Sequence, residues 1–125
     1  MLEKIDAHAN LAVRDLAVAR KFYEDTLGLS RVGSEGNELL VYRSGSTTLN
    51  VYKSQEAGTN KATAVTWAVG DGFEKVMRAL KDKGVKFERY DIPGLKREND
   101  VHLGGDMKVA WFKDPDGNIL NIVSR

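Results

Sequence analysis

The sequence contains no cysteine, which excludes disulfide bonds, thiolate nucleophiles and thiolate metal ligands. Its charges nearly cancel, with 19 Lys and Arg residues against 18 Asp and Glu residues. This balance predicts no nucleic-acid partner and no attraction to an anionic membrane. No stretch approaches the roughly 20 apolar residues that a membrane span requires, and residues 1–10 lack a signal-peptide pattern. We therefore expect a cytoplasmic protein.

The remaining composition is that of a globular protein. The 125 residues are 42% hydrophobic and 30% charged. That length suits one domain, residues 1–125, with a hydrophobic core of its own.

The first half of the chain reads as a strand, a helix and three further strands. Residues 5–13 alternate loosely between apolar and polar side chains, which predicts a strand. Asp15 is the expected N-cap of a helix over residues 16–27, and Gly28 is expected to end that helix. Its apolar stripe consists of Leu16, Ala19, Phe22, Tyr23 and Leu27. Short strands are expected at residues 29–33, 39–43 and 47–53.

The second half repeats this order. A strand within residues 61–71 precedes Asp71, which is expected to cap a helix and to form a capping box with Glu74. Gly84 is expected to end this helix, whose apolar stripe is Phe73, Val76, Met77 and Leu80.

Matching spacings indicate an internal duplication. Asp15 and Gly28 are separated by the same number of residues as Asp71 and Gly84, and "LNV" at 49–51 corresponds to "LNI" at 120–122. We expect two βαβββ modules, one over residues 1–53 and one over residues 61–125, joined by a linker at residues 54–60.

Two further segments stand out. Residues 91–106 are long, charged and contain Gly104-Gly105, so they predict either a lid over a pocket or a plain surface loop. "WFKDPDGNILNIVSR" (111–125) predicts two strands joined by a turn built on Asp114, Pro115 and Gly117. Asn121 is then a polar amide in an otherwise apolar strand.

The chain combines two paired modules with "DLAVARKFYEDTLGL" after the first strand and "WFKDPDGNIL" before the last. Together these features resemble the vicinal oxygen chelate superfamily. This group contains glyoxalases, bleomycin-resistance proteins and extradiol dioxygenases. The resemblance covers essentially the whole chain. It implies an α+β fold whose eight strands form a cup-shaped mixed sheet, with the helices outside and a ligand inside. It also implies a homodimer.

The resemblance further implies where a divalent metal would bind. The family's four ligand positions fall on His8, Asn50, Ala64 and Asn121. Only His8 is a strong ligand, because amides are weak neutral donors and Ala64 has no donor. We therefore expect no metal cofactor. If one binds, the expected ligands are His8, Asn50, Asn121 and His102.

Strand alternation predicts the lining of the cup. The polar residues that fall on the inner face, together with Trp111 if its strand keeps the register, form the expected ligand-binding set: His8, Asn10, Thr48, Asn50, Tyr52, Thr66, Trp111 and Asn121. Amides, hydroxyls and aromatic rings favour a metal-free protein that binds an aromatic or planar polar small molecule.

Three alternatives stay open. One is an enzyme of lyase, isomerase or dioxygenase type that uses His8 as metal ligand or general base. Another is an accessory module without a ligand. At the level of the site, Asn50 and Asn121 are alternatively structural amides that satisfy each other, with His8 buried beside them.

Overall fold

Two parallel strand pairs organise the chain in the computed structural model, which describes residues 1–125. They belong to two compact units. The first unit consists of residues 1–60 and 115–118, and the second of residues 61–114 and 119–125. Residues 54–60, the expected linker, group with the first unit.

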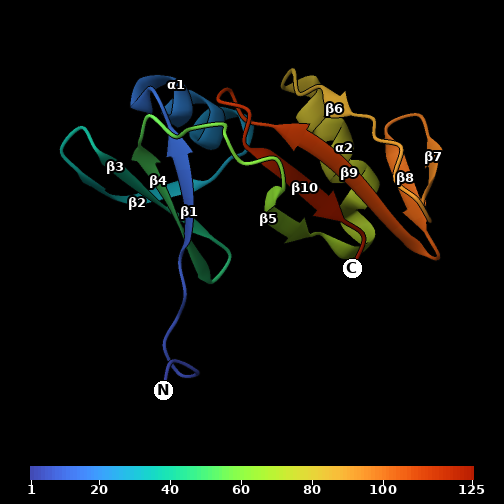
Figure 1. The fold of residues 1–125 in the computed structure, drawn as a ribbon, viewed down its shortest axis with the longest axis horizontal. Coiled ribbons are helices and arrows are strands. Elements are labelled where there is room, and N and C mark those ends of the chain that lie inside the picture. Colours follow the sequence, from blue (N-terminus) through green and yellow to red (C-terminus); the bar gives the residue numbers. More distant parts are fainter. The chain divides into compact units, whose positions relative to one another are not determined.

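The first unit is a four-stranded sheet in the order β1-β4-β3-β2, coloured blue to green in Figure 1. Strands β1 and β4 are parallel, and the other neighbours are antiparallel. The elements are β1 (Ala9–Val13), α1 (Leu16–Arg20), η1 (Lys21–Thr26), β2 (Ser30–Glu35), β3 (Leu39–Ser44) and β4 (Thr47–Lys53).

The predicted N-cap at Asp15 is confirmed. Its Oδ1 accepts hydrogen bonds from the backbone N–H groups of Ala17 (2.8 Å) and Val18 (3.3 Å). The helix after it is α-helical only to Arg20 and continues as the π-helix η1. Gly28 follows with φ +74°, the left-handed conformation expected of a glycine that ends a helix. From the predicted apolar stripe, Ala19 and Tyr23 are fully buried.

The second unit repeats this plan. Its sheet has the order β5-β10-β9-β8-β7, and β5 and β10 pair in parallel as β1 and β4 do. The elements are β5 (Thr63–Ala68), η2 (Gly70–Gly72), α2 (Phe73–Asp82), β6 (Phe87–Glu88), β7 (Lys96–Glu98), β8 (Val101–Gly104), β9 (Met107–Lys113) and β10 (Ile119–Val123).

The helix of this unit begins later than predicted. Asp71 lies inside the 3-10 turn η2, and the N-cap of α2 is Gly72, without a side-chain hydrogen bond. The expected capping box is therefore wrong. Gly70 adopts φ +57°, which bends the chain into η2 before the α-helix starts. Glu74, expected in that box, is instead paired with Lys108 of β9.

Ten strands are present, against the eight expected, because residues 91–106 contain the β7–β8 hairpin. Asn99, at its turn, has φ 55°, and no other non-glycine residue has a positive φ. Strand β9 pairs with β8 along one half and with β6 at Phe112 and Trp111 along the other. Two short strands, β6 and β8, therefore pair with different parts of β9.

Alternation places apolar side chains on one face of each sheet. In the first unit Leu49 and Val51 of β4 are buried, and in the second unit Leu120 and Ile122 of β10 are buried. The core of α2 is formed by Phe73, Met77 and Leu80. These residues follow the predicted pattern.

No helix has both the length and the apolar character needed to span a bilayer.

Candidate functional site

The predicted site residues of the first unit meet on β1 and β4. Asn10 and Asn50 are direct cross-strand neighbours, and Asn50 Nδ2 donates a 3.3 Å hydrogen bond to Asn10 Oδ1. Asn10 Nδ2 in turn donates to the His8 carbonyl at 3.3 Å. Thr48 and Tyr52 lie two residues on either side of Asn50, so they share its face of β4.

His8 lies just before β1 and its side chain is exposed. The alternative in which His8 is buried beside the amides is therefore wrong. Its only hydrogen bond in this cluster is made by its backbone carbonyl.

The predicted site residues of the second unit form one row across three strands. Asn121 on β10 is the direct neighbour of Thr66 on β5 and of Trp111 on β9. Direct neighbours point to the same face of a sheet, so these three side chains share a face. Thr66 is exposed, whereas Asn121 is 7% exposed. Asn121 Oδ1 has no hydrogen-bond partner.

A hollow of about 370 Å³ lies beside Trp111. It is lined by Lys61, Ala62, Thr63, Tyr90, Asp91, Ile92, Trp111 and Ile119. Trp111 Nε1 donates a 2.9 Å hydrogen bond to Thr63 Oγ1, which fixes the indole at this wall. The Tyr90 ring meets the indole edge to face, with 5.5 Å between centroids. Two aromatic rings and two isoleucines make this hollow suited to a flat, largely apolar molecule.

Sequence reasoning missed Thr63 and Tyr90. The segment "FERY" (87–90) gave no local signal for Tyr90, because it does not alternate between apolar and polar residues. Burial raises the pKa of Tyr90, as does the neighbouring Glu88, although Lys113 opposes them. The phenol therefore stays protonated at neutral pH.

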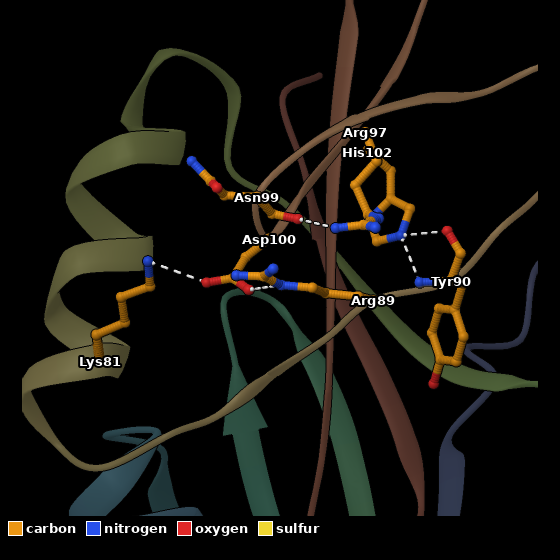
Figure 2. A network of polar contacts seen from close by, with 7 residues as sticks. All are labelled: Lys81, Arg89, Tyr90, Arg97, Asn99, Asp100 and His102. Carbon is orange, nitrogen blue, oxygen red and sulfur yellow. Dashed lines mark hydrogen bonds and ion pairs between the residues drawn. The ribbon is translucent and has the colours of Figure 1, made fainter.

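His102 is fully buried beside Trp111, and was expected only as a metal ligand supplied from a loop. It belongs to β8, and its ring centroid is 4.8 Å from that of Trp111. His102 Nε2 lies 2.9 Å from the Tyr90 backbone nitrogen, within hydrogen-bond distance (Figure 2). The same Nε2 lies 3.1 Å from the Tyr90 carbonyl oxygen, so it accepts from the N–H or donates to the carbonyl according to the tautomer of the ring.

Asp100 anchors the hairpin that contains His102. Figure 2 shows its carboxylate between Lys81 Nζ of α2, at 3.2 Å, and Arg89 Nε, at 3.0 Å. Burial alone would raise the pKa of Asp100, but the hydrogen bonds from Arg89 and Lys81 outweigh it and lower the pKa. Residues 91–106 therefore include a hairpin that is tied to its neighbours on both sides.

Residues 6–122 match the Glyoxalase/Bleomycin resistance protein/Dioxygenase superfamily. This match spans nearly the whole chain. The chain belongs to this superfamily. The resemblance found in the sequence motifs is thereby confirmed, as is the α+β fold, which has ten strands in two mixed sheets.

Solved structures share the superfamily fold with this chain. Lactoylglutathione lyase from Agrobacterium tumefaciens is 17% identical, with a TM-score of 0.70 over 96% of this chain and 92% of that one. A glyoxalase family protein from Enterococcus faecalis is 20% identical, with a TM-score of 0.69 over 98% and 99%. Oxidase ChaP-H2 is 21% identical, with a TM-score of 0.70 over 100% and 95%. A search of curated proteins finds no match.

The residues of this superfamily member do not fit a divalent metal centre. Nowhere does the chain gather three His, Asp or Glu side chains as a metal would require. The four family ligand positions supply one imidazole, two neutral amides and the methyl group of Ala64. Nε2 of His102 is already hydrogen-bonded to the Tyr90 backbone, a contact that a metal would have to replace. Such a donor set leaves a doubly charged cation without a compensating carboxylate.

Proposed function

We propose that this superfamily member is a small-molecule-binding protein that takes up a flat aromatic ligand in the hollow beside Trp111. The observation that supports this most directly is the pair of aromatic rings, Trp111 and Tyr90, at the wall of a hollow of about 370 Å³. A cavity of that volume accommodates a ligand of one or two fused rings.

Stacking and burial supply the affinity in this proposal. Aromatic pairs contribute about 0.5–1.5 kcal/mol beyond the burial of their area, and Trp111 is held in place by its hydrogen bond to Thr63. An indole that is already positioned loses little conformational entropy when a ligand stacks on it.

The other predicted contacts remain part of the proposal. Asn10, Thr48, Asn50 and Tyr52 offer amide, hydroxyl and phenol groups on one face of the first unit, and Thr66 and Asn121 do so in the second. We also propose a cytoplasmic homodimer, since members of this superfamily commonly pair. Light scattering coupled to size-exclusion chromatography measures the oligomeric state directly.

Binding can be tested through the intrinsic fluorescence of Trp111. The chain has two tryptophans, and Trp67 stacks on Phe112 with 6.5 Å between ring centroids. In a Trp67→Phe variant, all indole emission comes from Trp111. We expect quinoline, a neutral bicyclic aromatic probe, to change this emission in a saturable manner.

The matched control is Trp111→Phe, which keeps Trp67 as the only emitter. Quinoline should leave the Trp67 emission of that variant unchanged apart from collisional quenching. Saturable binding that is equal in both variants would place the ligand away from the hollow. Absence of saturable binding for quinoline and for larger fused aromatics would overturn the proposal.

A further inference from the structure

Two residues of opposite charge, Lys61 and Asp91, line the hollow beside Trp111, and its other lining residues are uncharged. Both charged side chains are exposed. Neither takes part in the ion pairs of the second unit, which join Lys81 and Arg89 to Asp100, Lys108 to Glu74, and Lys113 to Glu88. The hollow therefore offers one cation and one anion that are not paired with each other.

The two charged residues belong to opposite walls of the hollow. Lys61 lies just before β5, and Asp91 lies just after β6. Strands β10 and β9 lie between β5 and β6 in the sheet. Because neighbouring strands are about 4.8 Å apart, three such spacings place β5 and β6 about 14 Å from each other. The cation and the anion are thus held apart by the sheet beneath them.

The indole of Trp111 extends between these two walls. Trp111 is a residue of β9, yet its Nε1 donates a 2.9 Å hydrogen bond to Oγ1 of Thr63 on β5. Since β10 lies between β9 and β5, the side chain crosses β10 to make this contact. Tyr90, which precedes Asp91, meets the indole from the other wall. A flat molecule that lies against the indole therefore has one end toward Lys61 and the other toward Asp91.

This arrangement favours a ligand that carries both charges. An anionic aromatic molecule is attracted by Lys61 but repelled by Asp91, and a cationic one experiences the reverse. A neutral molecule gains from neither residue. A molecule with an anionic group at one end and a cationic group at the other gains from both, provided that the two groups are as far apart as the walls require.

We infer that the hollow selects a flat aromatic zwitterion, with its anionic end at Lys61 and its cationic end at Asp91. The inference rests on the proposed function and specifies the ligand class of the same hollow. The aromatic rings supply most of the affinity in this picture. The two exposed charges orient the ligand and discriminate between candidates, because exposed ion pairs are weak and are screened by salt.

The first test compares four naphthalene probes of similar shape by calorimetric titration of the wild-type protein. The zwitterion is 6-(aminomethyl)-2-naphthoate. The probe 6-methyl-2-naphthoate lacks the cation, (6-methyl-2-naphthyl)methylamine lacks the anion, and (6-methyl-2-naphthyl)methanol lacks both. At low ionic strength we expect the zwitterion to bind about fivefold more tightly than either singly charged probe, the upper range for one exposed ion pair. In 1 M salt, where the Debye length is about 3 Å, the four affinities should converge.

The second test assigns the two charges. In Lys61→Gln the zwitterion should lose its advantage over the amine, and in Asp91→Asn it should lose its advantage over the naphthoate. The matched controls are Lys86→Gln and Asp106→Asn, which remove the same charges from exposed residues of the second unit that do not line the hollow. Both controls should keep the preference of wild type.

The outcomes separate this inference from the proposed function. Equal binding of the zwitterion and the neutral alcohol at low ionic strength would overturn the inference and leave an aromatic site. A preference for the zwitterion that persists in both Lys61→Gln and Asp91→Asn would also overturn it, because other groups would then supply the charges. If quinoline binds and none of the four probes does, the zwitterion is again excluded. Failure of quinoline as well as the four probes would overturn both proposals.

Discussion

The hydroxyl of Tyr42 donates a 2.8 Å hydrogen bond to Oε2 of Glu24, which joins β3 to the π-helix η1. The same carboxylate oxygen lies 3.5 Å from Arg20 Nε and 3.7 Å from Arg31 Nε. Burial raises the pKa of Tyr42, and the hydrogen bond to Glu24 raises it further. One carboxylate thus connects the helix to two strands of the first sheet.

We predict that Tyr42→Phe destabilises the protein by about 1–2 kcal/mol, because Glu24 loses its neutral donor while staying partly buried. The alkaline response should change too. A pKa that is raised on folding contributes stability below the ordinary tyrosine pKa of about 10, and this contribution is lost as the pH rises above it.

The measurement is urea unfolding at pH 7 and at intervals above pH 9. As the pH rises, the unfolding free energy of wild type should fall more steeply than that of Tyr42→Phe. Tyr52→Phe is the control, since the Tyr52 side chain is 39% exposed. Identical alkaline slopes for wild type and Tyr42→Phe would show that this phenol is not the group responsible.

A second prediction concerns Gly58, where the chain passes close to the turn at residues 115–118. A Cβ at Gly58 would lie 2.1 Å from the Asp116 carbonyl oxygen. We expect Gly58→Ala to cost more than the 1–2 kcal/mol typical of a left-handed residue, because backbone must also move.

Gly28 is the matched control. Its φ of +74° equals that of Gly58 (+75°) within a degree, but a Cβ there meets nothing within 4 Å. The difference in unfolding free energy between Gly28→Ala and Gly58→Ala therefore measures the steric contact alone. Equal losses would contradict the close approach.

A third prediction concerns the anchoring of the β7–β8 hairpin by Asp100. Asp100→Asn removes the charge that Lys81 and Arg89 share, so we expect faster amide hydrogen exchange in β7 and β8 with little change elsewhere. The pKa of Asp100 is lowered on folding, so its contribution is present above about pH 4 and is lost as the pH falls through the lowered value.

Wild-type exchange in the hairpin should accordingly approach that of Asp100→Asn when the pH is lowered toward 3. The control is Asp106→Asn, an exposed residue just after β8. A hairpin that exchanges equally fast in wild type and Asp100→Asn at pH 6 would contradict the anchor.

A fourth prediction concerns metals and His8. Because the donor set lacks a carboxylate, we expect nickel, zinc, manganese and iron to leave the melting temperature of the tag-free protein unchanged. His8→Ala should behave as wild type in this assay, since the His8 side chain is exposed. Stoichiometric metal that is lost in His8→Ala would favour the lyase or dioxygenase alternative instead.

The sequence predicted the repeated parts of the fold because local patterns determine them. Alternation identified the faces of β4 and β10, and Asp15 identified the start of the first helix. The start of α2 was misplaced because Gly70 and Gly72 favour a 3-10 turn that competes with a cap at Asp71. The π-helix η1 has no local pattern of its own, because it is held by Tyr42 and Arg31 from neighbouring strands.

The candidate site was predicted only in part for a similar reason. Thr66, Trp111 and Asn121 followed from strand alternation, and the structure places them in one row. Tyr90 and His102 lie in the segment around residues 91–106, which looked irregular because its strands are short. Their contact depends on the pairing of β8 with β9, which no single stretch of sequence specifies.

The parallel pairing in each sheet has a consequence for synthesis on the ribosome. β10 sits between β5 and β9, so the second sheet lacks an interior strand until residues 119–123 have been made. The first unit is also incomplete until residues 115–118 have been made, because the Asn118 amide in this segment donates a hydrogen bond to the Ala12 carbonyl. Such long-range closures slow folding and keep the nascent chain exposed until late. In a chain that stops at Asn118, we expect β5 and β9 to be unpaired along the edges that β10 would join. Such a chain should be a substrate for chaperones and proteases.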